Sequence, residues 1–193
     1  MMHSNKKIIA SVLALAASGF CHADNSRGFY AGGNFGITLT DDFIITETQK
    51  PDAKLRMGTL EVLGGYKYNA FLGIDVRVGT GLVGKTVEVS DTVDADYDLG
   101  SYYAVYYRPE MINDYGSWYG LLGYSNVDYS VEIKNANGEV TDKLDESKSG
   151  MSFGFGVAWF LQNNVNFHIE ARSLINSDDI SGEIVTAGFD YRF

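Results

Sequence analysis

One histidine and one aspartate have the clearest potential for acid–base chemistry in this chain. His168 is the only histidine after residue 23, and Asp190 lies close to the end of the sequence. If the last two apolar-polar segments form a hairpin, these two side chains approach each other across neighbouring strands. A histidine base also needs a nucleophile within hydrogen-bond reach, and no serine adjoins His168-Ile169-Glu170. The pair therefore predicts a buried polar contact in preference to a catalytic centre.

The second candidate for chemistry is the acidic run Asp94-Ala95-Asp96-Tyr97-Asp98, which resembles the start of a calcium-binding loop. An EF-hand loop has glycine directly after the third acid and a glutamate at its last position. Leu99 and Val105 occupy these places, so the sequence excludes an EF-hand. Two interpretations stay open: weak binding of a divalent cation, and a solvated acidic loop, which is the commoner origin of such runs.

The first 23 residues have the pattern of a secretory signal peptide. Two lysines precede an apolar run over residues 8–20, and cleavage is predicted after Ala23. The run is shorter than the ~20 residues that a membrane helix needs. Phe20 stands directly before Cys21, where a lipoprotein cleavage site would have a small residue, so no lipid anchor is predicted.

The predicted mature domain, residues 24–193, is acidic and has no cysteine for a disulfide. It holds all 25 acidic residues and all but two of the 15 basic residues of the chain. This balance opposes binding to nucleic acid through its phosphates. The 22 glycines, 13 tyrosines and only 2 prolines of the chain favour sheet over helix. Since the domain lacks an apolar stretch of membrane-helix length, only a β-barrel would carry it across a membrane.

Alternation of apolar and polar residues predicts eight β-strands in this domain. They cover residues 28–39, 56–68, 71–82, 99–108, 117–130, 150–161, 165–174 and 182–193. Most reach the ~9–11 residues of a tilted transmembrane strand. An even number of strands lets the first and last pair, which closes the sheet. The sequence therefore predicts an all-β fold: an eight-stranded antiparallel up-and-down transmembrane β-barrel.

The two faces of each predicted strand differ in polarity. In the last strand an apolar set alternates with a polar set: Val185, Ala187, Phe189, Tyr191 and Phe193 against Thr186, Gly188, Asp190 and Arg192. Similar alternation assigns Ile169 to an uncharged face, and likewise Tyr119, Leu121 and Val127. A lysine or arginine at the lipid midplane costs about 2–4 kcal/mol. We therefore expect the uncharged faces to contact lipid, whereas a soluble lipocalin-like barrel would have the reverse arrangement.

The faces predicted to line the interior carry nearly balanced charges. They contribute four acidic and five basic side chains, with His168 among them: Glu61, Asp75, Glu170 and Asp190, and Lys67, Arg77, Arg108, Arg172 and Arg192. The interior of an eight-stranded barrel is only wide enough for side chains to fill. Because unpaired buried charges are costly, these residues are interpreted as an ion-paired plug. A narrow pathway for ions or small solutes is the alternative.

The connections between the predicted strands are alternately short and long, which in such barrels distinguishes the periplasmic end from the extracellular end. Aromatic residues gather beside the short turns, among them Tyr30, Tyr66, Tyr106 and Trp118, and are predicted to form a periplasmic girdle. Within the long connection 131–149, Asn-Gly at residues 137–138 predicts a hairpin. We expect the flanking strands to continue beyond the membrane as an acidic ribbon, which either docks a partner by strand addition or is a solvated extension.

These features resemble the small outer-membrane β-barrel family of Gram-negative bacteria, which includes the transmembrane domain of outer membrane protein A and small adhesin-like barrels. The resemblance rests on the signal peptide, the eight strands and the terminal Gly188-Phe189-Asp190-Tyr191-Arg192-Phe193. It implies an outer-membrane location, contact with outer-membrane lipid and lipopolysaccharide, and recognition of Gly188, Tyr191 and Phe193 by the barrel assembly machinery. Lipid A deacylases of the family carry a His-x-Ser pair and its acyltransferases begin with an amphipathic helix; this chain matches neither pattern.

The sequence thus predicts a monomeric outer-membrane barrel without catalytic residues, cofactor or metal. Its role is expected to be structural or adhesion-type surface interaction, with residues 91–98 and 131–143 contacting any extracellular ligand. The first alternative is a narrow porin-like channel. The second is a lipid A-modifying enzyme in which His168 acts as the base.

Overall fold

The computed structural model describes residues 27–40, 55–82, 84–90, 93–135, 140–161, 164–177 and 180–193. Their ten strands are β1 (Gly28–Thr40), β2 (Leu55–Lys67), β3 (Gly73–Gly81), β4 (Lys85–Ser90), β5 (Val93–Tyr107), β6 (Glu110–Ile112), β7 (Gly116–Asn135), β8 (Val140–Phe160), β9 (Val165–Ser177) and β10 (Ile180–Arg192). No helix in this part of the chain is long and apolar enough to cross a membrane. The predicted signal peptide, residues 1–23, lies outside the described residues.

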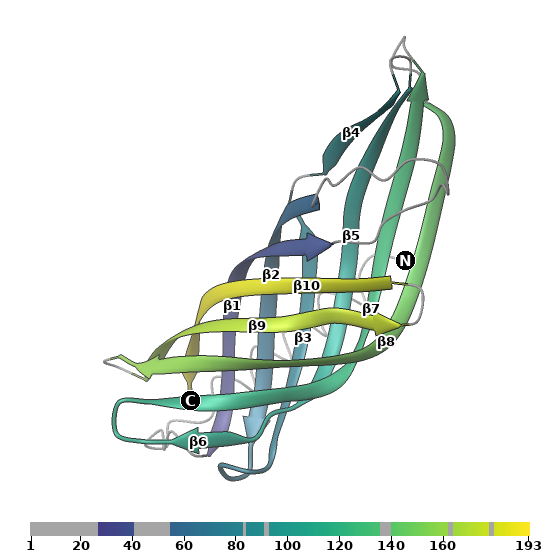
Figure 1. The fold of residues 1–193 in the computed structure, drawn as a ribbon. Coiled ribbons are helices and arrows are strands. Elements are labelled where there is room, and N and C mark those ends of the chain that lie inside the picture. Colours follow the sequence, from purple (N-terminus) through teal and green to yellow (C-terminus); the bar gives the residue numbers. More distant parts are fainter. Residues whose placement is uncertain are drawn as a thin grey trace, which may run out of the picture.

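Eight of these strands close a barrel: β1, β2, β3, β5, β7, β8, β9 and β10 (Figure 1). Every pairing is antiparallel, and β1 pairs with both β2 and β10, so the first and last strands meet. The β5–β7 pairing completes the ring. The predicted all-β, eight-stranded antiparallel barrel is therefore confirmed. Two short turns, at residues 68–72 and 113–115, mark one end, which we call the short-turn end.

The opposite end of the barrel is extended on one side by a four-stranded sheet, visible in Figure 1 as the tall part formed by β4, β5, β7 and β8. The β5–β7 ladder runs out to Val93↔Asn135, and the β7–β8 ladder to Lys134↔Val140. β4 pairs with the other edge of β5. We call this extension the ridge and define it as residues 85–90, 93–98, 129–135 and 140–148.

In the ridge, one prediction from the sequence is wrong, the acidic loop at residues 94–98, and another is confirmed, the hairpin around residues 131–143. Residues 94–98 were interpreted as a loop, but they belong to β5 and pair with β7. The run Asp-Ala-Asp-Tyr-Asp has the two-residue period of a strand, and the backbone groups of β5 are paired on both edges. The predicted hairpin around residues 131–143 is present as paired strands, although its tip, residues 136–139, lies outside the described residues.

β5 and β6 form one barrel strand that is interrupted at Pro109. Tyr107 pairs with Leu122 and Glu110 with Tyr119, so the register is the same on both sides of the proline. Pro109 has no N–H to donate, but its carbonyl accepts a hydrogen bond from the Gly120 N–H at 3.0 Å. The predicted strand ended at residue 108, whereas the structure continues it through β6. Glu110, which was assigned to a turn, is consequently buried inside the barrel.

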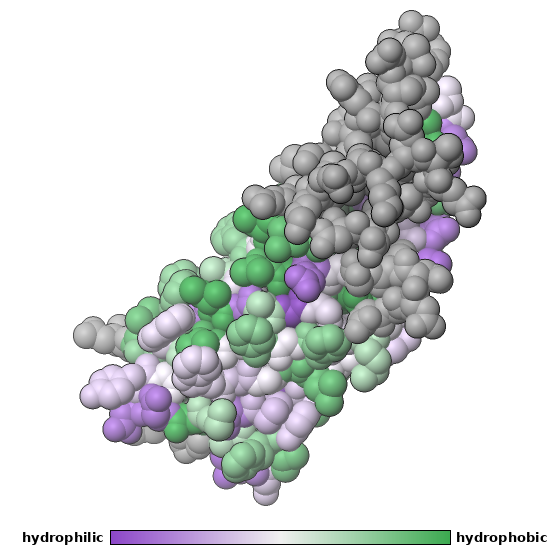
Figure 2. All heavy atoms as spheres, in the orientation of Figure 1, coloured by the Kyte–Doolittle hydropathy of each residue, from purple (hydrophilic) through white to green (hydrophobic). Residues whose placement is uncertain are grey.

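Most apolar faces point outward as predicted, and Figure 2 shows hydrophobic side chains over the visible barrel wall. β7 is the exception, because Tyr119, Leu121 and Val127 are 4%, 2% and 4% exposed and lie inside. Its outward residues are Trp118, Leu122 and Tyr124. Both faces of this strand are apolar, so alternation alone did not identify the lipid side. Tyr119 and Leu121 pack inside the barrel with Ala104, Tyr106 and Ala158, whereas Val127 belongs to a second apolar cluster.

The predicted aromatic girdle is also only partly correct. Phe29, Tyr66 and Trp118 are on the outer surface or partly exposed, and the Phe29 and Tyr66 rings lie 4.6 Å apart. Tyr30 and Tyr106 point inward and are buried, because their rings pack against interior guanidinium groups. Proximity to a turn therefore did not distinguish aromatic residues at the membrane surface from those that line the interior.

Candidate functional site

The interior is divided along the barrel into three layers, and the layer nearest the short-turn end is centred on Glu110. Its carboxylate contacts the Lys67 ammonium, and lies 2.9 Å from Arg108 Nε and 3.7 Å from Arg192 Nη2. All four residues are at most 2% exposed. The Tyr30 ring packs beside this group, with the Arg108 guanidinium carbon 5.1 Å from its centroid. One carboxylate, absent from the predicted interior, thus contacts three cations.

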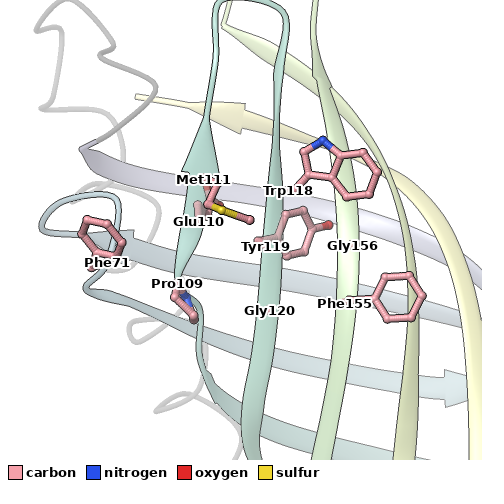
Figure 3. Close-up of a pocket in the computed structure, with 9 residues that line it drawn as sticks. All are labelled: Phe71, Pro109, Glu110, Met111, Trp118, Tyr119, Gly120, Phe155 and Gly156. Atoms are coloured by element: carbon pink, nitrogen blue, oxygen red, sulfur yellow. The ribbon is translucent and has the colours of Figure 1, made fainter.

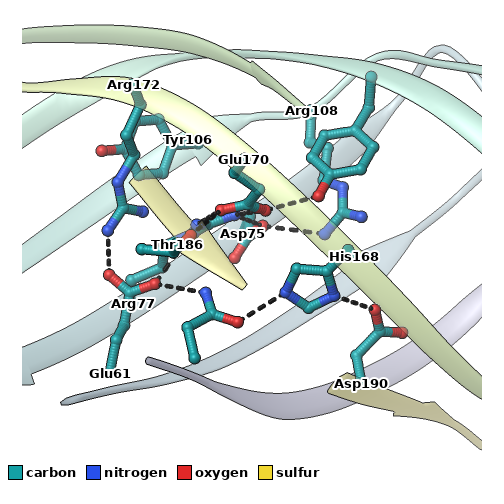
Figure 4. Close-up of polar contacts among 12 residues, drawn as sticks. Glu61, Asp75, Arg77, Tyr106, Arg108, His168, Glu170, Arg172, Thr186 and Asp190 are labelled. Atoms are coloured by element: carbon teal, nitrogen blue, oxygen red, sulfur yellow. Dashed lines mark hydrogen bonds and ion pairs between the residues drawn. The ribbon is translucent and has the colours of Figure 1, made fainter. Parts of the chain in front are cut away.

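The middle layer contains two arginines and their carboxylate partners (Figure 4). Arg77 donates to both oxygens of Glu170, with Nη2 2.9 Å from Oε1, and its Nη2 also lies 2.9 Å from Asp75 Oδ2. Arg172 donates to Glu61. A bidentate guanidinium–carboxylate pair is among the strongest and most directional contacts available to buried charges. With Glu110 included, the buried acids and bases of the described interior number five each.

Two further contacts join the ionic groups into one network. Arg108 Nη1 lies 3.2 Å from Asp75 Oδ2, which connects the Glu110 layer to the middle layer. The guanidinium carbon of Arg108 is also 3.8 Å from the centroid of the Tyr119 ring. The Tyr119 hydroxyl in turn donates to Glu170 Oε1 at 2.7 Å. Tyr119 therefore supports the interior network, although the sequence pattern assigned it to the lipid face.

His168 is enclosed by hydrogen-bond acceptors (Figure 4). Its Nδ1 lies 3.2 Å from Asp190 Oδ2 and its Nε2 lies 2.6 Å from Asn34 Oδ1. The Asn34 Nδ2 donates to Glu61 Oε1 at 2.8 Å, which fixes the orientation of this amide. Both ring nitrogens of His168 are therefore engaged by polar partners within the barrel, and the ring is part of the interior network.

The third layer, at the ridge end of the barrel, is apolar. It consists of seven side chains, each at most 5% exposed: Met57, Leu99, Tyr102, Val127, Leu174, Ile175 and Ile184. Sequence reasoning did not identify this layer, but two of its members gave a signal. Leu174 and Ile184 occupy the same strand faces as the inward Arg172 and Thr186. The charged network is therefore covered by hydrocarbon on the side toward the ridge.

The three C-terminal residues of the predicted assembly signal occupy two environments. Tyr191 faces outward, and its ring makes an edge contact with Phe193 at 5.2 Å. Gly188 pairs with Asn34 in β1 and with His168 in β9. A Cβ atom at Gly188 would lie 2.0 Å from Asn34 Oδ1 and 2.2 Å from the Gly33 carbonyl oxygen. Close packing thus requires glycine here independently of any recognition by other proteins.

Ion pairs order the side chains of the ridge. The Lys134 ammonium lies 2.5 Å from Asp96 Oδ2, and an ammonium therefore occupies the position where a metal bound by the acidic run would contact this carboxylate. Lys143 lies 3.5 Å from Glu132 and 3.6 Å from Asp145. No cluster of three or more metal-binding side chains occurs among the residues that the structure describes.

One ridge carboxylate has a displaced pKa. The Tyr129 hydroxyl donates to Glu146 Oε2 at 2.5 Å, and Lys148 Nζ lies 3.5 Å from the same oxygen. The hydrogen bond from Tyr129, with a smaller contribution from the Lys148 charge, lowers the pKa of Glu146 below its ordinary value of 4.5. Glu146 therefore stays ionised at mildly acidic pH and keeps this contact between β7 and β8.

Comparisons with known proteins agree with this architecture. The family model described as "outer membrane protein beta-barrel domain" matches residues 8–193. Ail of Yersinia pestis, solved with the heparin analogue sucrose octasulfate, is 20% identical with a TM-score of 0.59, over 87% of this chain and 99% of Ail. Neisserial surface protein A is 13% identical with a TM-score of 0.55, over 88% of this chain and 100% of that protein. OprG of Pseudomonas aeruginosa is 12% identical with a TM-score of 0.52, over 87% of this chain and 97% of OprG. No curated protein matches the sequence.

Proposed function

Because the chain belongs to the outer membrane protein beta-barrel domain family, we propose that it is a non-conducting outer-membrane protein whose ridge binds a partner outside the cell. The observation that carries this proposal is the combination of a filled interior with a long sheet extension at one end. Short turns face the periplasm in such barrels, so the ridge is assigned to the extracellular side.

The filled interior supports a plug and opposes a channel. A permeating ion would have to displace the ten charged side chains that pair within the barrel, and then cross the apolar layer. Hydrophobic constrictions exclude water and thereby block ions. In planar bilayers we expect the protein to be electrically silent. As a comparison, the double variant Leu174→Ala, Ile184→Ala thins the apolar layer and should raise ion leakage. Steady nanosiemens-scale openings of the unmodified protein would instead establish the porin-like alternative.

The enclosure of His168 supports a non-enzymatic role. The side chain is 0% exposed, and the two groups that contact its ring nitrogens are Asn34 and Asp190, neither of which is a nucleophile. We therefore assign His168 to the interior network. His168→Ala should leave the lipid A composition of a producing strain unchanged by mass spectrometry. A loss of one lipid A species in that strain would revive the enzyme hypothesis.

The ridge offers an edge to which a further strand can be added. β8 pairs with β7 from Val140 onward, but its pairing with β9 starts only at Met151↔Asn176. Among the described residues, 140–150 therefore have no strand on their second edge. Unpaired backbone N–H and C=O groups of such an edge bind extended peptides by strand addition. Lys143 and Lys148 on the edge strand oppose indiscriminate pairing, as charged residues commonly do at sheet edges.

The charge of the ridge indicates the type of partner. Its described acidic side chains include Asp96, Glu132, Asp145 and Glu146, which outnumber its described lysines. Ail was solved with a sulfated, and hence anionic, ligand. An acidic ridge disfavours a ligand of that sign, so we infer an extended partner segment with basic residues. Isothermal titration of this protein with sucrose octasulfate should accordingly show no binding.

The ridge proposal is tested by adhesion of producing bacteria to cultured epithelial cells. In the test variant, residues 129–146 are replaced by a two-residue turn, which removes residues 140–146 of the unpaired edge but keeps the barrel strands. Adhesion should fall to the level of cells without the protein. The variant Glu132→Gln, Asp145→Asn is the matched control for charge, and should reduce adhesion while the edge remains. Equal adhesion of all strains, at equal surface amounts, would refute the proposal.

Further assignments complete the proposed biogenesis. Residues 1–23 act as a signal peptide, and Gly188, Tyr191 and Phe193 are read by the barrel assembly machinery. The mature protein is a monomer in contact with lipopolysaccharide, and needs no cofactor. Removal of the aromatic ring in Phe193→Ala should lower the amount of heat-modifiable protein in the outer membrane. An unchanged amount would contradict the assembly role.

A further inference from the structure

A groove on the outer wall of the barrel lies beside Gly120, where the surface has no side chain. Gly120 pairs with Phe155 of β8. If Gly120 carried a Cβ atom, the nearest side-chain atom to it would be Pro109 Cγ, at 3.7 Å. Around this gap stand large outward side chains that are 57–72% exposed: Phe71, Met111, Trp118 and Phe155. Figure 3 shows these groups around the bare backbone of Gly120. The groove encloses about 330 Å³.

Two features of the chain produce this groove. Pro109 interrupts the strand formed by β5 and β6, and its ring provides a low part of the wall next to Gly120. The neighbouring outward positions on β7 and β8 carry aromatic rings, Trp118 and Phe155. Glycine opposite an aromatic residue thus leaves a depression with rigid sides. Its exposed lining is hydrocarbon, because Glu110 and Tyr119 beneath it point into the barrel and are buried.

The position of the groove identifies the molecule that faces it. Gly120 is four residues from the start of β7, which corresponds to about 13 Å along the strand from the short-turn end at ~3.3 Å per residue. The apolar band of such barrels is about 25 Å tall. The groove therefore opens to hydrocarbon in the half of the membrane nearest the short turns. It continues the lipid-facing surface of the barrel wall on both sides.

We propose that this groove is a discrete lipid site that holds one acyl chain of a phospholipid in the periplasmic leaflet. Attraction between a protein and lipid tails comes from van der Waals packing, because both are apolar. A chain in the groove contacts Phe71 and Phe155 on its sides and Gly120 below, and thus touches more protein atoms than a chain on the convex wall. A chain there consequently exchanges more slowly with bulk lipid and is selected by its shape.

Trp118 provides a direct signal for occupancy of the groove. The chain has 2 tryptophans, so Trp159→Phe leaves Trp118 as the only indole. This protein, refolded in detergent, is titrated with phosphatidylethanolamine that is brominated on one acyl chain, and quenching of Trp118 fluorescence is measured. Site binding should give saturation at a low lipid mole fraction. A brominated alkyl detergent should give only a gradual decrease over the same range.

Gly120→Leu fills the groove and should raise the lipid fraction at half-quenching at least about fivefold. Gly64→Leu is the matched control, since Gly64 is also on the outer wall and a Cβ there meets only the Tyr30 carbonyl oxygen at 3.8 Å; its curve should equal that of the parent. If Gly120→Leu does not refold, Gly120→Ala should shift the curve by a smaller factor. The same curve for parent and both Gly120 variants, or equal saturation by the brominated detergent, would overturn the proposal.

Discussion

Glu110 is the residue whose replacement most directly tests the interior network. Glu110→Gln keeps the shape of the side chain but removes the negative charge that faces Lys67, Arg108 and Arg192. Two of these contacts are 2.9 Å or shorter, and all four groups are buried. Removing one partner of a buried ion pair costs about 3–5 kcal/mol, because the other charge is left uncompensated. We expect a loss of this size in the free energy of unfolding.

The measurement is a urea titration of the protein folded into phospholipid vesicles, followed by tryptophan fluorescence. Asp114→Asn is the control, because it removes the same charge from an exposed turn position four residues away. Substitutions of this kind at the surface usually change the free energy of unfolding by no more than about 0.5 kcal/mol. If Glu110→Gln also stays within that range, Glu110 is hydrated, and the paired interior described above is wrong.

A double-mutant cycle separates charge pairing from general damage. Lys67→Met alone should be milder than Glu110→Gln, because Glu110 keeps its contact with Arg108. In the Glu110→Gln background, the same Lys67 change removes a cation that has lost its partner, and so should recover stability. Contacting residues typically show coupling of about 0.5–3 kcal/mol. Additivity of the two changes would mean that the observed ion pair contributes nothing.

Two further predictions test the wall of the barrel and the ridge. Ile169→Arg places a charge in the lipid and should cost about 2–4 kcal/mol in the same vesicle assay, whereas the inward His168→Gln should be much milder; equal losses would show that the faces are misassigned. The Glu146 carboxyl should titrate below pH 4.5 by NMR, because its pKa is lowered by the Tyr129 hydroxyl. Because the Tyr129 hydroxyl stabilises the ionised carboxylate, the contact is present above the pKa of Glu146 and is lost as the pH falls through that pKa. Tyr129→Phe should return the titration midpoint of Glu146 toward 4.5.

The barrel could be predicted from the sequence because charge placement is strongly constrained in lipid. Ile169 and His168 illustrate this, since the uncharged residue faces outward and the polar one inward. Where a strand has no charge on either face, the constraint disappears. This is the case between residues 117 and 127 of β7, and the lipid face there was predicted wrongly. Only Ser117 and Ser125, both buried, indicated the interior side of this strand.

Glu110, the interior residue that the sequence did not predict, was missed for a different physical reason. Glu110 follows a proline, and proline normally ends or borders a strand because it cannot donate to the ladder. Here the carbonyl of Pro109 still bonds Gly120, and the next residues resume the register. The two-residue period continues from Arg108 to Glu110 across the proline. The excess of one base in the predicted interior was the available signal, since buried charges tend to be balanced.

The ridge is an extension of the barrel wall and not a separate loop, which determines how the proposed binding edge is held. β7 has 20 residues, whereas a tilted strand crosses a membrane with about 9–11, so roughly half of it projects. Register shifts occur near the base of the ridge, between Leu99 and Tyr102 in the β5–β7 ladder and between Met151 and Gly154 in the β8–β9 ladder. Such bulges increase local twist and bending. They lie beside the apolar layer that contains Leu99 and Tyr102, whose packing therefore anchors the base of the ridge. A partner strand added to β8 would pair with an edge that is already ordered. The entropy lost on binding would then come from the backbone of the partner strand and not from the ridge.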